Sequence, residues 1–222
     1  MVEASLGRTL DSTPRRFGHG DVITRQGDPV SSLSLVASGV VRLSAVTSAG
    51  REIVVGLLGA GQVFGEAALL DEGGERGSLV EARAVGSATI VEIPSATLRT
   101  VIEGSPATGE ELLRLVAARL YRTSAALEEA LAQDVPARVS RRLRQLALDH
   151  GDRRAGGGVR LRVPLTQGEL ARMVGASREA VNRSLGALVA RGLVRTEHRT
   201  FVIPDVDALE RSEIEGAAAG GP

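Results

Sequence analysis

The sequence of 222 residues contains no cysteine, no lysine and no tryptophan, and only 2% of its residues are aromatic. The lack of cysteine excludes a disulfide framework, a thiolate zinc site, a cysteine-ligated iron–sulfur cluster and a catalytic thiol. The lack of lysine excludes a Walker A phosphate loop, Schiff-base chemistry and a kinase-type catalytic lysine. Several large classes of enzyme are therefore excluded before any motif is considered.

Long apolar runs and hydrolase motifs are also missing. The longest nearly uncharged apolar run, residues 53–61, is far shorter than the roughly 20 residues of a membrane span. The N-terminus shows no charged segment followed by an apolar core, so no signal peptide is expected. There is no HExxH, no GxSxG and no cluster of His and Asp. We expect a cytoplasmic protein that is not an enzyme, holds no metal and does not contact a membrane.

Charge is unevenly distributed although the formal net charge is zero. Residues 1–107 hold nine arginines against 12 acidic residues, whereas residues 135–204 hold 14 arginines against five, a net charge of +9. The last 18 residues are acidic again. A basic block of this size is typical of a segment that meets a polyanion such as nucleic acid, although solvated surface arginines would give the same count.

The first hundred residues alternate short β-branched runs with glycine. Such strands at a spacing of roughly 8–12 residues predict an antiparallel barrel or sandwich. Turns are expected at residues 27–28, 38–39, 49–50 and 73–74. The predicted strands cover residues 34–36, 40–46, 52–58 and 89–93.

A helical pattern replaces the strands after Pro106. Apolar residues recur at alternating spacings of three and four, which predicts a coiled-coil seam of about three heptads and a homodimer along this helix. The seam carries one polar residue, Thr123, which either sets the register of the two helices or faces a ligand. Its members are Leu113, Val116, Leu120, Thr123, Leu127 and Ala130.

The basic block predicts several short elements after a hinge at residues 135–136. We expect a helix over residues 137–148, a glycine-rich loop over 150–158 and a strand over 159–163. Thr166 and Glu169 have the spacing of a capping box that starts a helix ending near Gly175, and Ser177 caps a further helix that reaches about residue 190. A hairpin formed by residues 193–197 and 200–203 follows.

Two short helices joined by a turn and followed by a hairpin predict a winged helix-turn-helix. On its second helix Val181, Leu185 and Leu188 share one face and are expected to be buried. The opposite face carries residue types that read base edges, since arginine pairs with guanine and a carboxylate accepts from cytosine N4. That face consists of Arg178, Glu179, Asn182, Arg183 and Gly186. The alternative is a merely solvated face.

The segment TQGELARMVGASREAVNR, residues 166–183, resembles the helix-turn-helix of the cyclic AMP receptor protein superfamily of bacterial transcription regulators. The resemblance implies that Arg178, Glu179 and Arg183 read a TGTGA-type half-site. We also expect DNA contacts at Thr166, Gln167, Ser177 and Asn182.

Residues 64–70, FGEAALL, with Glu75 and Arg76 after them, are similar to the phosphate-binding cassette of cyclic-nucleotide β-rolls. Arg76 would pair with the cyclic phosphate. Backbone N–H groups at Gly77 and Ser78 would cradle the phosphate. Glu66 would accept from a ribose hydroxyl next to Gly65. The alternative is a plain ion pair between Glu66 and Arg76.

The resemblance adds Thr123 and Ser124 as the pair that reads adenine from the dimer helix. One position departs from the family pattern, because Gly77 stands where a serine usually follows the cassette arginine. This substitution puts in doubt the affinity and the preference between cAMP and cGMP. The resemblance also implies that the loop over residues 150–158 contacts RNA polymerase.

Together these patterns predict an α+β protein with an antiparallel β-roll, a long dimerisation helix and a winged helix-turn-helix. We expect a β-roll over residues 1–107, the helix over 108–134, the DNA-binding domain over 135–210 and a disordered tail over 211–222. The predicted function is a homodimeric regulator of transcription that binds double-stranded DNA under the control of cAMP. Two alternatives stay open: the same regulator with another effector or none, and a cyclic-nucleotide module that regulates a partner protein.

Overall fold

The computed structural model describes residues 13–69, 77–155, 157–163, 165–197 and 200–211. The chain divides into two compact units, Met1–Ser124 and Ala125–Pro222, which we treat one at a time. No helix in the described ranges is long and apolar enough to cross a membrane.

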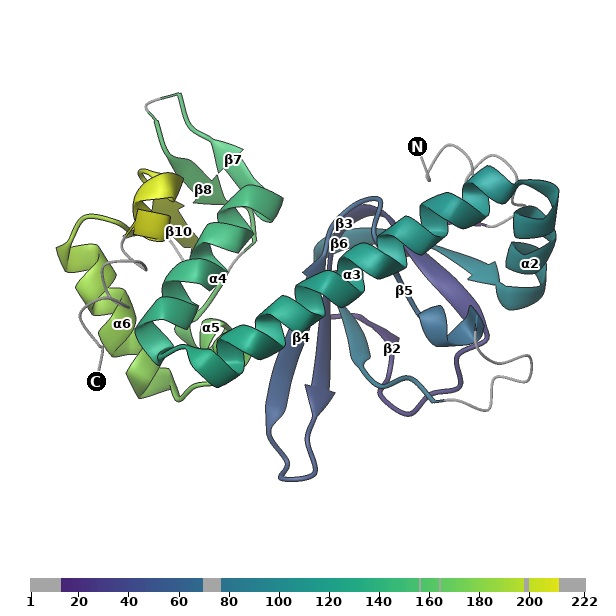
Figure 1. Ribbon diagram of the computed structural model, residues 1–222, viewed down its shortest axis with the longest axis horizontal. Coiled ribbons are helices and arrows are strands. Elements are labelled where there is room, and N and C mark those ends of the chain that lie inside the picture. Colours follow the sequence, from purple (N-terminus) through teal and green to yellow (C-terminus); the bar gives the residue numbers. More distant parts are fainter. Residues whose placement is uncertain (1–12, 70–76, 156, 164, 198–199, 212–222) are drawn as a thin grey trace. The chain divides into compact units, whose positions relative to one another are not determined.

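The N-terminal unit is built on a six-stranded antiparallel sheet, as the strand spacing predicts (Figure 1). Strands β1, β6, β3 and β4 lie in that order, β2 pairs with β6, and β5 pairs with β3. The strands are β1 (Arg15–Phe17), β2 (Val22–Thr24), β3 (Ser32–Val46), β4 (Glu52–Leu58), β5 (Val63–Phe64) and β6 (Glu81–Pro94). The expected turn at residues 73–74 lies outside the described residues.

One expectation for this sheet is wrong. The sequence predicts two strands separated by a turn at Ser38 and Gly39, but β3 is one strand of 15 residues. Its register against β6 shifts between Val36 and Ser38 and again between Ser38 and Val40. The glycine therefore lies in a β-bulge, where an extra residue bends a strand without ending it.

Two apolar clusters hold this unit together. One lies within the roll around Val41, Leu43 and Ile90. The other joins the sheet to two helices, α2 (Ser95–Gly104) and α3 (Pro106–Ala132), and buries Leu98 and Leu112. One face of α3 is thereby fixed against the roll, which determines the residues that it turns toward the cassette.

The C-terminal unit combines helices α4, α5 and α6 with a four-stranded antiparallel sheet of order β7-β8-β10-β9. A core of buried apolar residues from all three helices includes Leu143, Leu170 and Val181. The elements are α4 (Val135–His150), β7 (Gly151–Arg153), β8 (Val159–Leu161), α5 (Gln167–Val174), α6 (Arg178–Ala190), β9 (Arg195–Glu197) and β10 (Thr200–Ile203).

Part of the segment expected to be a loop is in fact a strand. Gly151, Asp152 and Arg153 pair with Leu161, Arg160 and Val159, so strands β7 and β8 form an antiparallel pair. The sequence gives no sign of this strand, because Gly151, Asp152 and Arg153 carry no apolar side chain and therefore show no periodic pattern. The pairing is instead enforced by β10, which fixes β8 from its other side.

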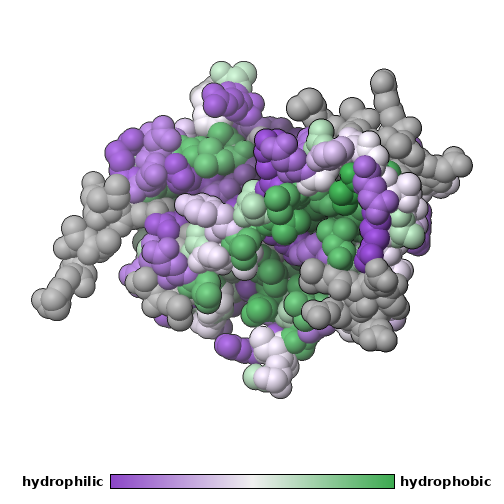
Figure 2. Space-filling model, turned by 45° about the vertical axis from the view of Figure 1, so that its right-hand side comes forward, coloured by the Kyte–Doolittle hydropathy of each residue, from purple (hydrophilic) through white to green (hydrophobic). Residues whose placement is uncertain are grey.

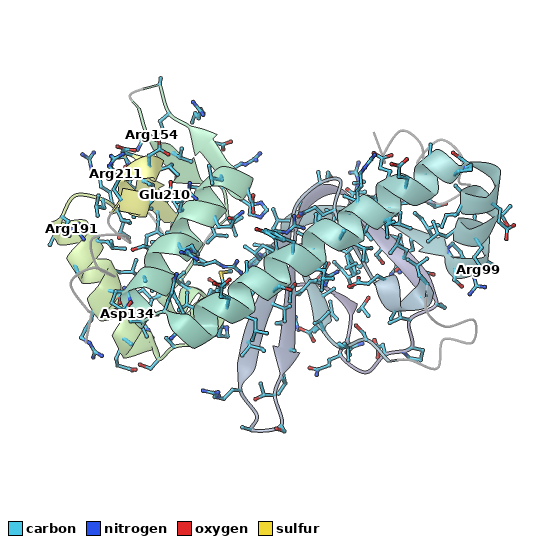
Figure 3. The ribbon with its side chains drawn as sticks, in the orientation of Figure 1. Arg99, Asp134, Arg154, Arg191, Glu210 and Arg211 are labelled. Carbon is cyan, nitrogen blue, oxygen red and sulfur yellow. The ribbon has the colours of Figure 1, made fainter. Side chains whose placement is uncertain are left out.

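The chain continues after β10 into a short helix, residues 206–211, that packs on this unit. Leu209 is completely buried, Glu210 accepts from Arg144 Nη2 at 2.8 Å, and Arg211 pairs with Asp205 at 2.9 Å. Figure 3 labels Glu210 and Arg211 beside Arg154, which pairs with Glu197. Arg211 is thus helical, which corrects its placement in a disordered tail; residues 212–222 lie outside the described residues.

Candidate functional site

The cassette begins where β5 ends and a 3-10 helix, η1 (Glu66–Leu69), starts. Gly65 links them with φ of 79°, and a Cβ there would lie 2.8 Å from the Ser32 carbonyl oxygen. Only glycine accepts both the left-handed backbone and this close approach without strain. The sequence thus places Glu66 at a defined position at the start of η1.

The carboxylate of Glu66 is held by a residue that the sequence reasoning missed. Arg119 Nη1 on α3 donates to Glu66 Oε2 at 2.8 Å and lies 3.5 Å from the Val63 carbonyl oxygen. Both side chains are partly buried, 23% exposed for Arg119 and 36% for Glu66. The signal that could have identified Arg119 is its position one helical turn before Thr123.

This ion pair changes the interpretation of the cassette. Among the described residues, Glu66 pairs with Arg119, and this contact leaves the alternative of a Glu66–Arg76 pair open. Arg76 itself lies outside the described residues. Glu66 therefore connects the cassette to the long helix even without a ligand.

The C-terminal end of the cassette is attached to the turn at Gly27. Ser78 N–H donates to the Asp28 carbonyl oxygen at 2.8 Å, and Gly27 N–H donates to the Ser78 carbonyl oxygen at 2.8 Å. The Ser78 hydroxyl donates to the Val80 carbonyl oxygen at 2.7 Å. Ser78 is therefore not the free donor that the sequence interpretation expects. This leaves the Gly77 N–H as the candidate backbone donor from this pair.

Gly77 lies too close to another backbone segment to accept a side chain. It forms an isolated antiparallel bridge with Pro29, and a Cβ at Gly77 would lie 2.8 Å from the Gly27 carbonyl oxygen. The glycine that departs from the family pattern is thus matched to its surroundings in this chain.

We therefore expect Gly77→Ser to destabilise the folded protein instead of restoring a phosphate contact. Forcing a side chain against the Gly27 backbone should cost about 1–3 kcal/mol, as overpacking does. Thermal unfolding monitored by circular dichroism measures this cost. Gly104→Ser is the matched control, since nothing lies within 4 Å of a Cβ at Gly104. A Gly77→Ser protein as stable as the wild type would contradict the expectation.

Thr123 and Ser124 are exposed on α3, one turn beyond Arg119. A small pocket of 60 Å³ lies between η1 and α3, and its lining includes Glu66, Arg119 and Arg122. Thr123 and Ser124 are not among its lining residues. The volume is well below the roughly 300–1,000 Å³ of ligand pockets.

The opposite face of α3 is apolar and exposed. Leu113, Leu120 and Tyr121 are 68%, 67% and 78% exposed, whereas Leu112 on the inner face is 5% exposed. Figure 2 shows patches of apolar surface among hydrophilic residues on the face that it presents. Leu113 and Leu120 belong to the predicted coiled-coil seam, and Leu127 is 61% exposed as well.

The helix-turn-helix begins as the sequence predicts. Thr166 Oγ1 accepts from Glu169 N–H at 3.2 Å, and Glu169 Oε2 accepts from Thr166 N–H at 2.7 Å, so the capping box is complete. Helix α5 ends at Gly175, whose φ of 63° stops the helix and turns the chain. Ser177 Oγ accepts from Ala180 N–H at 3.2 Å and starts α6.

The two faces of α6 also follow the prediction. Val181, Leu185 and Leu188 are buried against the unit. The opposite face is open to solvent, and its exposed members are Arg178, Glu179, Asn182, Arg183 and Gly186. Within the described part of the chain, no salt bridge joins Arg178 or Arg183 to an acidic residue, so both guanidinium groups are available to a polyanion.

Glu179 is prepared to act as an acceptor. Hydrogen bonds from its own backbone N–H and from the Ser177 hydroxyl, with the charges of Arg178 and Arg183, hold the pKa of this carboxyl below its ordinary value. It is therefore ionised throughout the neutral range, as a carboxylate that accepts from cytosine N4 must be. Gln167 and Asn182 form a further contact, in which Gln167 Nε2 donates to Asn182 Oδ1 at 3.0 Å.

Two family models match the chain. Residues 14–105 match the cyclic nucleotide-binding domain, and residues 137–212 match the Crp-like helix-turn-helix domain. Among solved structures, the c-di-GMP responsive global regulator CLP of Xanthomonas campestris is similar with a TM-score of 0.76 and 28% identity. That likeness covers 92% of this chain and 98% of the other.

Curated relatives are similar in sequence to this chain along most of its length. The CRP-like cAMP-activated global transcriptional regulator of Mycobacterium tuberculosis is 35% identical over 208 residues, which are 94% of this chain and 90% of the relative. The cyclic AMP receptor protein of Thermus thermophilus is 35% identical over 199 residues, covering 88% and 86%. With its cyclic nucleotide-binding domain and its helix-turn-helix, this chain belongs to the cyclic AMP receptor protein family of DNA-binding transcription regulators.

Proposed function

We propose that the protein is a homodimeric regulator, and not an enzyme, that binds palindromic DNA of the TGTGA type when cAMP is bound. The observation that carries the proposal is the open face of α6, which presents Arg178, Glu179 and Arg183 beside a complete helix-turn-helix. Arginine and carboxylate side chains near the N-terminus of a recognition helix read base edges in the major groove.

The effector site is proposed within the N-terminal unit. The ribose would bind at Glu66, and the phosphate at Arg76 and the Gly77 N–H. Adenine would meet Thr123 and Ser124 on α3. The Glu66–Arg119 pair supports this assignment because it already joins the cassette to the helix that carries Thr123. A ligand that touches both elements would favour the state in which they are suitably placed, by its difference in affinity for the two states.

We propose a functional division into a β-roll over residues 1–107, a dimerisation helix over 108–134 and a DNA-binding domain over 135–210. The exposed Leu113 and Leu120 support the dimer, because a monomer would leave these two large apolar side chains in water. Two recognition helices one DNA turn apart, about 34 Å, would then meet the two half-sites.

The β7–β8 strand pair is proposed to contact RNA polymerase in the cytoplasm, where the chain would act. The exposed Arg153 at the end of β7 supports a polar docking surface. Shortening residues 153–158 should abolish activation in a reconstituted transcription assay while DNA binding persists. Full activation by the shortened chain would refute this part of the proposal.

A fluorescence-anisotropy titration of a TGTGA-N6-TCACA duplex tests the main proposal. It is carried out with and without cAMP at one salt concentration, because phosphate contacts make affinity depend steeply on salt. Tightening by about tenfold or more, which is about 1.4 kcal/mol of coupling, would support both sites and their linkage. Tight binding that ignores cAMP would favour another effector. The similarity to a c-di-GMP responsive regulator makes that nucleotide the first to try next.

We expect Arg178→Ala to lose base discrimination. The variant should bind the cognate duplex about 1–3 kcal/mol more weakly while its affinity for scrambled DNA changes little, because a bidentate arginine–guanine contact carries this amount of discrimination. Anisotropy on the two duplexes measures the difference. Arg153→Ala, an exposed arginine outside α6, is the matched control. An equal loss on both duplexes for Arg178→Ala would assign it to phosphate contact.

A further inference from the structure

We infer that Gln167 and Asn182 act as one unit that reads adenine, in which Asn182 contacts the base and Gln167 is a positioning residue. This inference rests on the proposed DNA-binding function and adds a base position to it. The observation that carries it is the hydrogen bond of 3.0 Å from Gln167 Nε2 to Asn182 Oδ1.

Both partners are placed by rigid elements. Gln167 is the first residue of α5 and follows Thr166, whose capping box fixes the start of that helix. Asn182 lies on α6 one turn after Arg178, on the same exposed face. The bond therefore crosses from the first helix of the motif to the base-reading face of the second.

The chemistry of the amide identifies the base. A carboxamide oxygen has two lone pairs and the nitrogen carries two hydrogens. Gln167 uses one lone pair of Asn182 Oδ1, so the second lone pair and both Nδ2 hydrogens stay available. Adenine presents N7 as an acceptor and the N6 amino group as a donor in the major groove. Asn182 can satisfy both at once, and Gln167 defines which side of the amide carries the oxygen.

A purely structural role for this bond is disfavoured by its surroundings. The two helices are already joined by buried apolar residues, among them Leu170, Val174 and Val181. Asn182 is exposed, where water competes for the same hydrogen bonds. The bond adds little to the packing of the helices, but it does restrict the orientation of an amide on the base-reading face.

The test is a selection from duplexes with randomised half-sites, carried out on the full chain with and without cAMP, followed by anisotropy on the selected sequences. The variants are Asn182→Ala, Gln167→Met and the double substitution. Gln145→Met is the matched control, because Gln145 Nε2 donates to Asp149 Oδ2 at 2.8 Å on α4, outside the helix-turn-helix. Asn182→Asp tests the chemistry, since a carboxylate has lost the donors to adenine N7 and accepts from cytosine N4.

We expect Asn182→Ala to lose an adenine preference of about fivefold or more at one position of each half-site. Gln167→Met should lose preference at that same position, and the double variant should lose no more than Asn182→Ala alone. Asn182→Asp should shift the preference there toward cytosine, and Gln145→Met should change nothing.

Two results would overturn the inference while the proposed function survives. Wild-type chain could select a defined motif that Asn182→Ala leaves unchanged, or Gln167→Met could weaken binding to all duplexes equally and keep the adenine preference. If the wild-type chain selects no motif under either condition, the proposed function fails and this inference fails with it.

Discussion

A chain carrying Leu113→Glu and Leu120→Glu will be monomeric and will bind a palindromic duplex at least about a hundredfold more weakly than the wild type. Each leucine is about two-thirds exposed in the single chain. Burying a leucine contributes about 1.5–3 kcal/mol, and a twofold dimer contains each of these residues twice. A dimer that binds two linked half-sites gains on the order of 10²–10⁴ in affinity over a single module. A monomer loses this gain, which accounts for the weaker binding expected here.

Sedimentation velocity and anisotropy together measure both effects. Binding to a duplex with a single half-site should change much less than binding to the palindrome, because one recognition helix suffices there. Leu148→Glu is the matched control, since Leu148 is 59% exposed on α4, outside the proposed seam. A double variant that stays dimeric at micromolar concentration would contradict the assignment of this face of α3.

The second large effect is expected from the ion pair between the cassette and α3. Arg119→Leu should weaken cAMP binding by about 10–150-fold, because a hydrogen bond to a charged group contributes about 1.5–3 kcal/mol. The same substitution should abolish most of the tightening of DNA binding by cAMP, since Arg119 holds Glu66 against the helix that carries Thr123. Isothermal titration calorimetry with cAMP and the anisotropy assay measure the two quantities.

The chain supplies a control of the same chemistry. Arg114 and Glu110 form an ion pair of 2.6 Å on the same helix, but they are 72% and 63% exposed. Arg114→Leu should therefore leave cAMP binding unchanged, as exposed pairs contribute little. Glu66→Gln combined with Arg119→Leu should cost less than the sum of the two single substitutions. Additive losses would show that Arg119 and Glu66 act independently.

Much of the helix-turn-helix could be predicted because its signals are local. The capping box at Thr166 and Glu169, the stop at Gly175 and the buried face of α6 all depend on residues within one or two turns of each other. The side chains of such residues must meet once the helix forms. The outer face of α3 was predictable for the same reason, since a spacing of three and four places Leu113 and Leu120 on one stripe.

Two of the errors concern contacts between strands. Gly39 has the appearance of a turn in sequence, but pairing with β6 carries β3 through it as a bulge. Residues 151–153 have no strand pattern of their own, yet β8 pairs with them. In both cases hydrogen bonds to a neighbouring strand determine the backbone conformation. The local sequence does not indicate which strand that neighbour is.

The sequence alone determined the α+β class, the exposed apolar stripe of the long helix and the buried and exposed faces of α6, because each follows from periodicity within an element. Only the tertiary structure decided how the candidate sites are connected. Glu66 meets Arg119 across 53 residues and Gln167 meets Asn182 across 15. The Ser78 N–H, an expected phosphate donor, is taken by Asp28. These partners are set by how the elements pack, and packing brings together residues whose spacing in the chain carries no signal.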